Sequence, residues 1–331
     1  DVLVLGGGLA GCVCAWQCHL RGYSVMVVDQ PGRSNSSRVA AGLLNPISGM
    51  RFVVNPSFEA LRTEALGLYR RLERAWGVSL FHSLPQWRVF RSEAQRARWL
   101  RRMDEPLVKP WHGPLMGQAD FPRHVLAPFG GFEVPLAGWL DVNELIAQTR
   151  ARLPCREMVI EDEHIECRED SIHFHNMVAK RAILCRGYRE SYRHFAPQQL
   201  QHSKGEILLL SIPGLEPTHS INKGAWLLPI GDGLWKAGAT YDSENLGEEP
   251  STRGREELLS RVSRIVTCKV EIVDHLVGVR PTSKDRLPIV LHHCGAPLSL
   301  FNGLGSKGTL LAPATSRRLM QHLGDAGVAV C

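Results

Sequence analysis

Two features are missing from this sequence, and each absence narrows what the protein can be. No apolar run reaches the about 20 residues that a membrane-spanning helix needs, which argues against a membrane protein. No large excess of one charge is present either, because the formal net charge is only +6 over 331 residues. This mild positive charge suits an anionic cofactor or substrate and permits RNA without requiring it. The length allows two domains or one large one.

The nine cysteines include no CxxC pair, which argues against a disulfide framework or a zinc site. Such scattered thiols are typical of a reducing compartment, so we predict a cytoplasmic protein. His292, His293 and Cys294 are adjacent, a spacing poorly suited to one ion, so we predict no metal there and interpret them as a surface loop. Asp1 already lies in an expected strand, so we expect residues to precede it. The sequence leaves open whether a short leader is among them.

The first 29 residues carry the strongest motif. An apolar strand over Val2–Leu5 leads into the glycines of GGGLAG, a helix is expected to about Arg21, and a second strand ends on Asp29. This order is the βαβ fingerprint of a dinucleotide-binding fold. Gly6 makes the tight turn, Gly8 admits a pyrophosphate and Gly11 lets the helix pack closely, while Asp29 would accept hydrogen bonds from a ribose. The motif alone does not separate NAD(P) from FAD.

Later segments indicate a cofactor domain assembled from separate pieces. The spacing predicts helices over residues 57–75 and 139–153, the second with Asp141 as its cap. A buried strand over residues 181–187 ends on Gly187, as if returning to the ligand edge of the first sheet. Residues 204–212 and 224–239 alternate like strands of an antiparallel sheet. The arginine-rich stretch 91–102 is interpreted as a solvated helix face, with an RNA-facing role as the alternative.

The fingerprint and six further ordered segments are similar to the D-amino-acid oxidase, glycine oxidase and sarcosine oxidase superfamily of FAD enzymes. Besides the fingerprint, they are AAGLLNP, GWLDVNEL, GEILLL, the pair WLLP and GLWKAGATY, GVRPTSKDRLP and FNGLGSKGTLLAP. The resemblance covers nearly the whole chain and implies FAD. It implies an α/β (α+β) fold with a discontinuous Rossmann-like FAD domain over residues 1–78, 139–200 and 277–331. A substrate domain with a mixed, largely antiparallel sheet would comprise residues 79–138 and 201–276.

The resemblance also assigns residues that would contact the cofactor. The ADP half would be held by the fingerprint glycines and Asp29, and the flavin ring would lie between the two domains. Val279 stands where sarcosine oxidases place the cysteine that bonds to FAD, so the flavin is expected to be noncovalent. The remaining predicted contacts are Ala41 and Gly42 in a turn near the ring, Gly187, and the loop of Gly303, Leu304, Gly305 and Ser306, whose N–H groups would approach the pyrimidine end. By itself the Ala40–Gly42 stretch could be only a tight loop.

Three cations are the predicted substrate-site and oxygen-site residues. Arg280 matches the arginine that grips a substrate carboxylate, with a structural ion pair to Asp285 as the alternative. Lys307 matches a carboxylate-binding lysine and Lys236 an oxygen-activating one, although either could be an ordinary surface lysine. Trp226 replaces the tyrosine of D-amino-acid and glycine oxidases and cannot share a hydroxyl with a carboxylate, so the substrate grip departs from that of a standard amino-acid oxidase.

The resemblance implies FAD-dependent oxidation of the C–N bond of an amino acid or N-substituted glycine. Hydride would pass to the flavin and the imine would hydrolyse, with oxygen or an electron carrier as final acceptor. Oxygen is favoured because of Lys236. Some motifs also resemble the FAD domain of the bifunctional enzyme that removes a carboxymethyl group from the wobble uridine of tRNA, so tRNA is an alternative substrate. A noncatalytic flavoprotein is the third interpretation.

Overall fold

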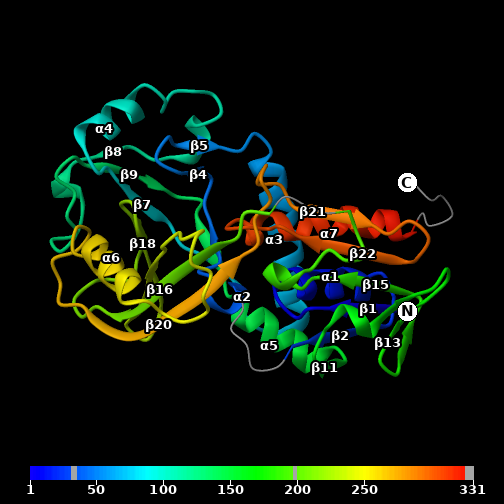
Figure 1. The fold of residues 1–331 in the computed structure, drawn as a ribbon. Helices are drawn as coiled ribbons and strands as arrows, with labels where there is room; N and C mark the ends of the chain where they lie inside the picture. The colour runs from blue at the N-terminus through cyan, green and yellow to red at the C-terminus, as the bar shows by residue number, and fades with distance from the viewer. Residues whose placement is uncertain (31–35, 197–199, 325–331) are drawn as a thin grey trace.

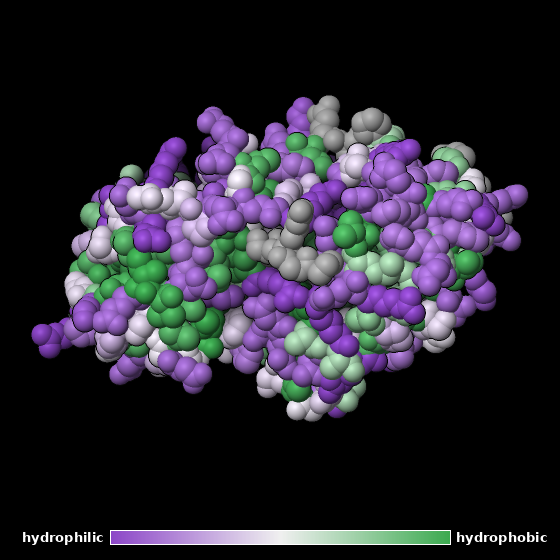
Figure 2. Space-filling model, turned by 60° about the horizontal axis from the view of Figure 1, so that its bottom comes forward, coloured by the Kyte–Doolittle hydropathy of each residue, from purple (hydrophilic) through white to green (hydrophobic). Residues whose placement is uncertain are grey.

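A computed structural model describes residues 1–30, 36–196 and 200–324 of the chain. Two large sheets organise it, as Figure 1 shows, with the six-stranded sheet on the right and the eight-stranded sheet on the left. The observed architecture is therefore the predicted mixed α/β fold. No helix of the described residues is both long and apolar enough to cross a membrane. On the face drawn in Figure 2, apolar and polar residues are mixed, with more apolar groups over the half that carries the eight-stranded sheet.

The six-stranded sheet begins with the predicted fingerprint. Val2 pairs in parallel with Val25 on one side and with Arg181 on the other, so a strand from far along the chain lies beside the first one. Five neighbouring strands are parallel and the last pairs in antiparallel fashion with its neighbour. In spatial order the sheet contains β11 (Cys155–Glu157), β2 (Val25–Asp29), β1 (Val2–Leu5), β15 (Arg181–Leu184), β22 (Leu298–Asn302) and β21 (Ile289–His292).

The eight-stranded sheet is antiparallel except where β17 pairs with β7, as expected for the predicted substrate domain. In order it contains β20 (Glu271–Arg280), β16 (Ser203–Ser211), β19 (Leu234–Gly238), β18 (Trp226–Gly231), β17 (Ser220–Asn222), β7 (Gln86–Val89), β9 (Gly131–Val134) and β8 (Leu115–Met116). β20 runs across the predicted domain boundary at residue 277 and pairs with β16 up to Arg280. The assignment of residues to two domains otherwise stays a prediction.

Three small sheets complete the strands. They are β3 (Leu43–Leu44) with β10 (Gly138–Leu140) and β6 (Phe81–Ser83), then β12 (Ile165–Cys167) with β13 (Ile172–Phe174) and β14 (Met177–Ala179), and β4 (Ile47–Ser48) with β5 (Val53–Val54). The α-helices among the described residues are α1 (Leu9–His19), α2 (Ser36–Val39), α3 (Phe58–Trp76), α4 (Glu93–Leu100), α5 (Val142–Arg152), α6 (Thr252–Val262) and α7 (Gly308–Gly324).

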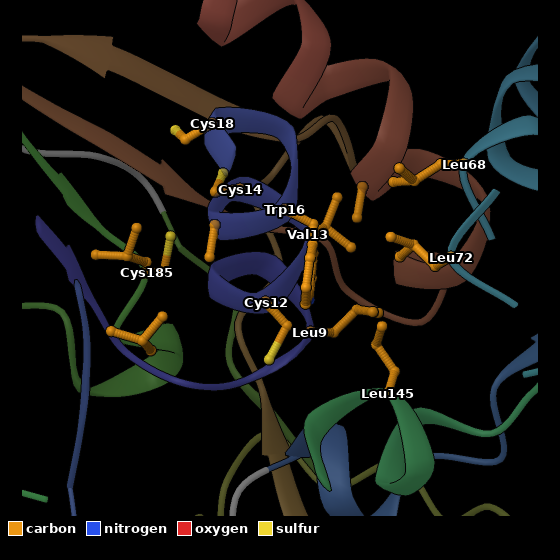
Figure 3. Packing of buried hydrophobic residues seen from close by; sticks show 14 of the residues in the cluster. Leu9, Cys12, Val13, Cys14, Trp16, Cys18, Leu68, Leu72, Leu145 and Cys185 are labelled. Atoms are coloured by element: carbon orange, nitrogen blue, oxygen red, sulfur yellow. The ribbon is translucent and has the colours of Figure 1, made fainter. Parts of the chain in front are cut away.

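Helix α1 is buried on nearly every side, which explains why its sequence is apolar almost throughout (LAGCVCAWQCH). Figure 3 shows Cys14 and Cys18 on the side of Cys185, and Val13 and Trp16 toward the neighbouring helices. Trp16 donates its indole N–H to Thr149 Oγ1 of α5 at 2.9 Å. Burial raises the pKa of the Cys12 thiol to about 12, so this sulfur stays protonated and packs as a small apolar group.

The start of α1 lies unusually close to β1. A Cβ atom added at Gly11 would lie 1.8 Å from the Gly6 carbonyl oxygen, and one at Gly6 would lie 2.3 Å from the Cys185 carbonyl oxygen. Gly6 also has φ +116°, which side chains rarely adopt. Glycine is therefore required at both positions for the helix to begin where it does.

We expect Gly11→Ala to destabilise the protein by about 1–3 kcal/mol, because the new methyl group must push α1 away from the strand. Gly67→Ala is the matched control, since Gly67 is exposed on α3 with no heavy atom within 4 Å of the added Cβ. That control should stabilise the protein by about 0.5–1 kcal/mol. Urea unfolding of both variants measures the difference, and a Gly11→Ala protein as stable as the parent would refute the close packing.

Candidate functional site

A cavity of about 1070 Å³, including its solvent-open mouth, lies between the two large sheets. Gly8 after β1, Cys185 and Gly187 after β15, and Asn302 at the end of β22 form its wall on the side of the six-stranded sheet. All follow the carboxyl ends of parallel strands, where α/β sheets bind ligands. The opposite wall comes from the eight-stranded sheet and from the residues that follow its strand β19, and includes Gly205, Ile207, Trp226, Ala239, Tyr241, Gly278 and Arg280.

The N-terminus of α1 points into this cavity with hydroxyl groups beside it. Gly8 lines the cavity together with Ser36 and Ser37 of α2. The Ser37 hydroxyl accepts the Leu9 N–H at 3.0 Å, and a Cβ at Gly8 would lie 2.9 Å from that oxygen. The helix dipole and these hydroxyls favour an anion such as a phosphate, but the Leu9 N–H is already bonded to Ser37, so the pyrophosphate contact at Gly8 stays a prediction. Gly6 and Gly11 lie behind this surface and set its position.

Asp29 lies in a second, smaller pocket, together with Gly7, Arg150 and Arg156. Its Oδ1 accepts the Gly7 N–H at 2.9 Å and its Oδ2 accepts from Arg150 Nη2 at 2.8 Å. The carboxylate is thus held at the end of β2 by two hydrogen bonds within the protein, and its contact with a ribose stays a prediction. A ribose hydroxyl would have to share this carboxylate with Arg150, a partner on α5 that the sequence did not indicate.

The turn Ala40–Gly42 lines the cavity as predicted for a segment near the flavin ring. Gly42 has φ +66°, and an added Cβ would lie 1.9 Å from the Leu140 carbonyl oxygen. Lys236 of β19 lies outside the cavity lining and donates from Nζ to the Ala40 carbonyl at 3.1 Å. Burial lowers the pKa of Lys236, and Asp141 partly opposes this shift. The lysine therefore contacts the back of the turn, and its role toward oxygen stays a prediction.

The second glycine loop contributes Leu304, Gly305 and Ser306 to the cavity wall, whereas Gly303 is not part of the lining. The Gly303 N–H donates to Asn302 Oδ1 at 2.8 Å, and the Gly305 N–H donates to the Pro281 carbonyl at 3.0 Å. These two N–H groups are already bonded within the protein. Of the four predicted loop residues, Leu304 and Ser306 therefore stay the candidates to donate a backbone N–H to a flavin.

Lys307 is exposed at the start of α7, where its carbonyl accepts from the N–H groups of Leu310 and Leu311. Its neighbours Ser306 and Gly308 line the cavity, but Lys307 does not. The geometry thus gives the predicted carboxylate role of Lys307 no support. Gly187 does line the cavity, and its carbonyl accepts from Asn302 Nδ2 at 2.7 Å.

Arg280 lies at the end of β20, half-buried, with its side chain in the cavity wall. Burial lowers the pKa of Arg280, yet among residues 1–30, 36–196 and 200–324 no carboxylate forms an ion pair with it. Asp285, the alternative partner, instead accepts the Leu287 N–H at 3.0 Å. The ring of Tyr241 lies 4.8 Å from the guanidinium carbon. This cation is therefore available to an anionic ligand.

Several residues of the cavity and of the smaller pocket were not predicted from the sequence, among them Ser37, Arg150, Tyr241 and Asn302. The serine pair follows the polar loop after β2 and could have been suspected, since that loop leads from the fingerprint. Tyr241 comes directly after a strand and is directed to the cavity only by the pairing of β19 with its neighbours. Asn302 lies in the motif FNGLGSKGTLLAP, of which only the following residues were assigned a role, and Arg150 carried no local signal.

A glycine turn at the carboxyl edge of a parallel sheet, with a cavity beside it, is the arrangement of a dinucleotide-binding protein. The chain belongs to the FAD dependent oxidoreductase family, which matches residues 1–322. Its cofactor is therefore FAD, and a cradle of glycines and hydroxyls that side chains would fill fits such a molecule. Noncovalent binding of FAD stays a prediction. It is supported by Val279, which is buried and offers no nucleophile.

Solved structures share this fold. Glycine oxidase from Geobacillus kaustophilus is 20% identical, with a TM-score of 0.80 over 100% of this chain and 96% of that one. Iminodiacetate oxidase from Chelativorans sp. is 18% identical, with a TM-score of 0.82 over 100% of this chain and 97% of the other.

The curated relatives are named for tRNA modification and not for amino-acid oxidation. The tRNA 5-methylaminomethyl-2-thiouridine biosynthesis bifunctional protein MnmC of Cupriavidus necator is 24% identical over 326 residues, covering 87% of this chain and 48% of that protein. The protein of the same name from Burkholderia mallei is 26% identical over 325 residues, covering 88% of this chain and 48% of its own length. The chain thus spans about half the length of the curated relatives that it matches.

We expect Asp29→Asn to weaken FAD binding by about 10- to 100-fold, because a ribose hydroxyl would lose its charged acceptor and the bond from Arg150 would weaken. Glu157→Gln is the matched control. Glu157 pairs with the same Arg150 at 2.8 Å but its side chain is 55% exposed, so binding should change less than about threefold. Titration of the apoprotein with FAD, followed by flavin fluorescence, gives both dissociation constants. Equal loss in the two variants would contradict a special role for Asp29.

Proposed function

We propose that this chain oxidises the C–N bond of a small amine that carries a carboxylate, either an amino acid or an N-substituted glycine. The observation that carries the proposal is Arg280, a cation in the cavity wall with no carboxylate partner among the described residues. A guanidinium can donate two parallel hydrogen bonds to a carboxylate. The substrate would be anchored at this end, with its amine directed into the cavity.

FAD supplies the hydride acceptor when bound. The carbon next to the neutral amine loses its hydrogen with the electron pair, a C=N bond forms, and water then cleaves the imine to a carbonyl compound and an amine. The chain contributes mainly position, because Arg280 holds the carboxylate while Trp226 and Ile207 limit the space around the rest of the substrate. Holding reactants in the reactive geometry is itself a large catalytic effect.

Anaerobic titration of the FAD-loaded protein with glycine, sarcosine, proline and D-amino acids tests this proposal. We expect one of them to bleach the visible flavin band. Arg280→Gln should lower kcat/KM for that substrate by about 100-fold, the loss of a charge-assisted bidentate contact. Lys307→Gln is the matched control, and we expect little effect because Lys307 lies outside the cavity lining. Bleaching that is equally efficient in Arg280→Gln would exclude the proposed grip.

For the electron acceptor we propose oxygen, with Lys236 as the contributing cation. A positive charge close to the ring would stabilise the negative charge that oxygen gains on reduction. Lys236 contacts the Ala40 carbonyl, directly behind the turn that lines the cavity. A dehydrogenase that passes electrons to a carrier is the alternative.

We expect Lys236→Met to slow reoxidation of the reduced protein by oxygen at least about tenfold, since the charge is lost while the aliphatic stem is kept. The reduction step should change much less. Stopped-flow mixing of anaerobically reduced protein with oxygenated buffer measures the rate. If reoxidation is fast and unchanged in Lys236→Met, the role of Lys236 is excluded; if the parent itself reoxidises slowly, an electron carrier becomes the better assignment.

A second candidate is the removal of a carboxymethyl group from a modified tRNA wobble uridine. The curated relatives that carry tRNA modification in their name favour it. The same Arg280 would then hold the carboxymethyl carboxylate, and the nucleotide would project through the mouth of the cavity. If no small amine bleaches the flavin but tRNA carrying that modification does, this function replaces the first. If neither a small amine nor the modified tRNA reduces the flavin, a noncatalytic flavoprotein becomes the best interpretation.

A further inference from the structure

The guanidinium of Arg280 lies flat over the neighbouring strand. In the register of β20 with β16, Arg280 pairs with Ser203 and Gly278 pairs with Gly205. A Cβ atom added at Gly205 would lie 2.1 Å from Arg280 Nη2 and 2.3 Å from both Cζ and Nη1. These three nearly equal distances mean that Gly205 lies against the flat face of the guanidinium. Any other residue at position 205 would displace the guanidinium.

Tyr241 covers the same group with its ring. The guanidinium carbon lies 4.8 Å from the ring centroid, within the range of a cation–π contact. Tyr241 follows β19 and is 66% exposed, so it stands at the mouth of the cavity. Since Gly205 lies against one face of the guanidinium, the opposite face is the one open to the ring. Arg280 Nη1 also points toward the Thr240 carbonyl, at 3.5 Å.

The geometry points to Gly205 and Tyr241 as the two walls of a guanidinium slot that hold Arg280 in one plane, so that a substrate carboxylate binds only to its edge. This inference rests on the proposed function, because it concerns how the same Arg280 site selects its ligand. Tyr241 is a positioning residue in this arrangement, since it acts through Arg280.

The slot explains how the site works without the hydroxyl that Trp226 cannot supply. All five N–H bonds of a guanidinium lie in its plane, and its faces donate nothing. With both faces covered, a ligand must approach in that plane, where two parallel bonds to the two oxygens of a carboxylate are available. Holding the long arginine side chain in place before binding also reduces the entropy lost on binding. The slot therefore favours a planar carboxylate over other small anions.

Titration of the FAD-loaded protein with acetate, an inert carboxylate, tests the slot through the change in flavin absorbance. We expect Tyr241→Leu to weaken acetate binding by about 3- to 10-fold, since the cation–π contact is lost, and Tyr241→Phe to restore it to within about twofold of the parent because the ring remains. KM for the amine substrate should rise by the same factor, with a smaller change in kcat. Tyr188→Leu is the matched control, because Tyr188 makes a similar contact of 5.3 Å with Arg189 outside the cavity lining.

Arg280→Gln separates failure of this inference from failure of the proposed function. If acetate does not bind the parent, or binds Arg280→Gln equally well, the proposed carboxylate site is wrong. If Arg280→Gln abolishes binding but Tyr241→Leu binds acetate like the parent, only the slot is overturned. Gly205→Ala tests the other wall and should lose acetate binding. FAD content and melting temperature, measured on each variant, identify any loss that comes from misfolding.

Discussion

The close approach of α1 to β1 is the constraint on which the rest of the structure depends. Gly11 packs against the Gly6 carbonyl and Gly6 against the Cys185 carbonyl, so helix, first strand and returning strand meet at distances that no side chain permits. This contact places the helix N-terminus at the sheet edge, with Ser37 beside it. These backbone contacts thereby fix where the helix N-terminus, and with it the predicted phosphate site, lies relative to the second sheet.

The eight-stranded sheet supplies the complementary half of the cavity. Its strands β16, β19 and β20 bring Gly205, Tyr241 and Arg280 together, although 75 residues separate the first and last of them. A cation with an open edge at this place is compatible with both candidate functions, because an amino acid and a carboxymethylated amine present the same group. The two candidates therefore differ in what lies outside the cavity, where Tyr241 is exposed.

Much of the fold could be predicted from the sequence because its signals are local. The βαβ unit ends at Asp29 as expected, and the predicted cap Asp141 accepts the Glu144 N–H at 2.9 Å at the start of α5. The return of the strand that precedes Gly187 to the first sheet was also predicted, from apolar residues closing on glycine. The positions of the predicted site residues were harder to predict. Arg280 and Gly42 line the cavity, whereas Lys236 and Lys307 do not.

The sequence by itself determined the class of protein, because short-range spacing of glycine, apolar residues and one acid is sufficient to encode a dinucleotide fold, and six ordered motifs specify FAD. Only the tertiary structure decided which cations face the cavity and what surrounds them. Strand register places Gly205 beneath Arg280, and the pairing of β19 brings Tyr241 beside it. Such contacts depend on residues far apart in the chain, and no local pattern specifies the direction of a side chain across a sheet.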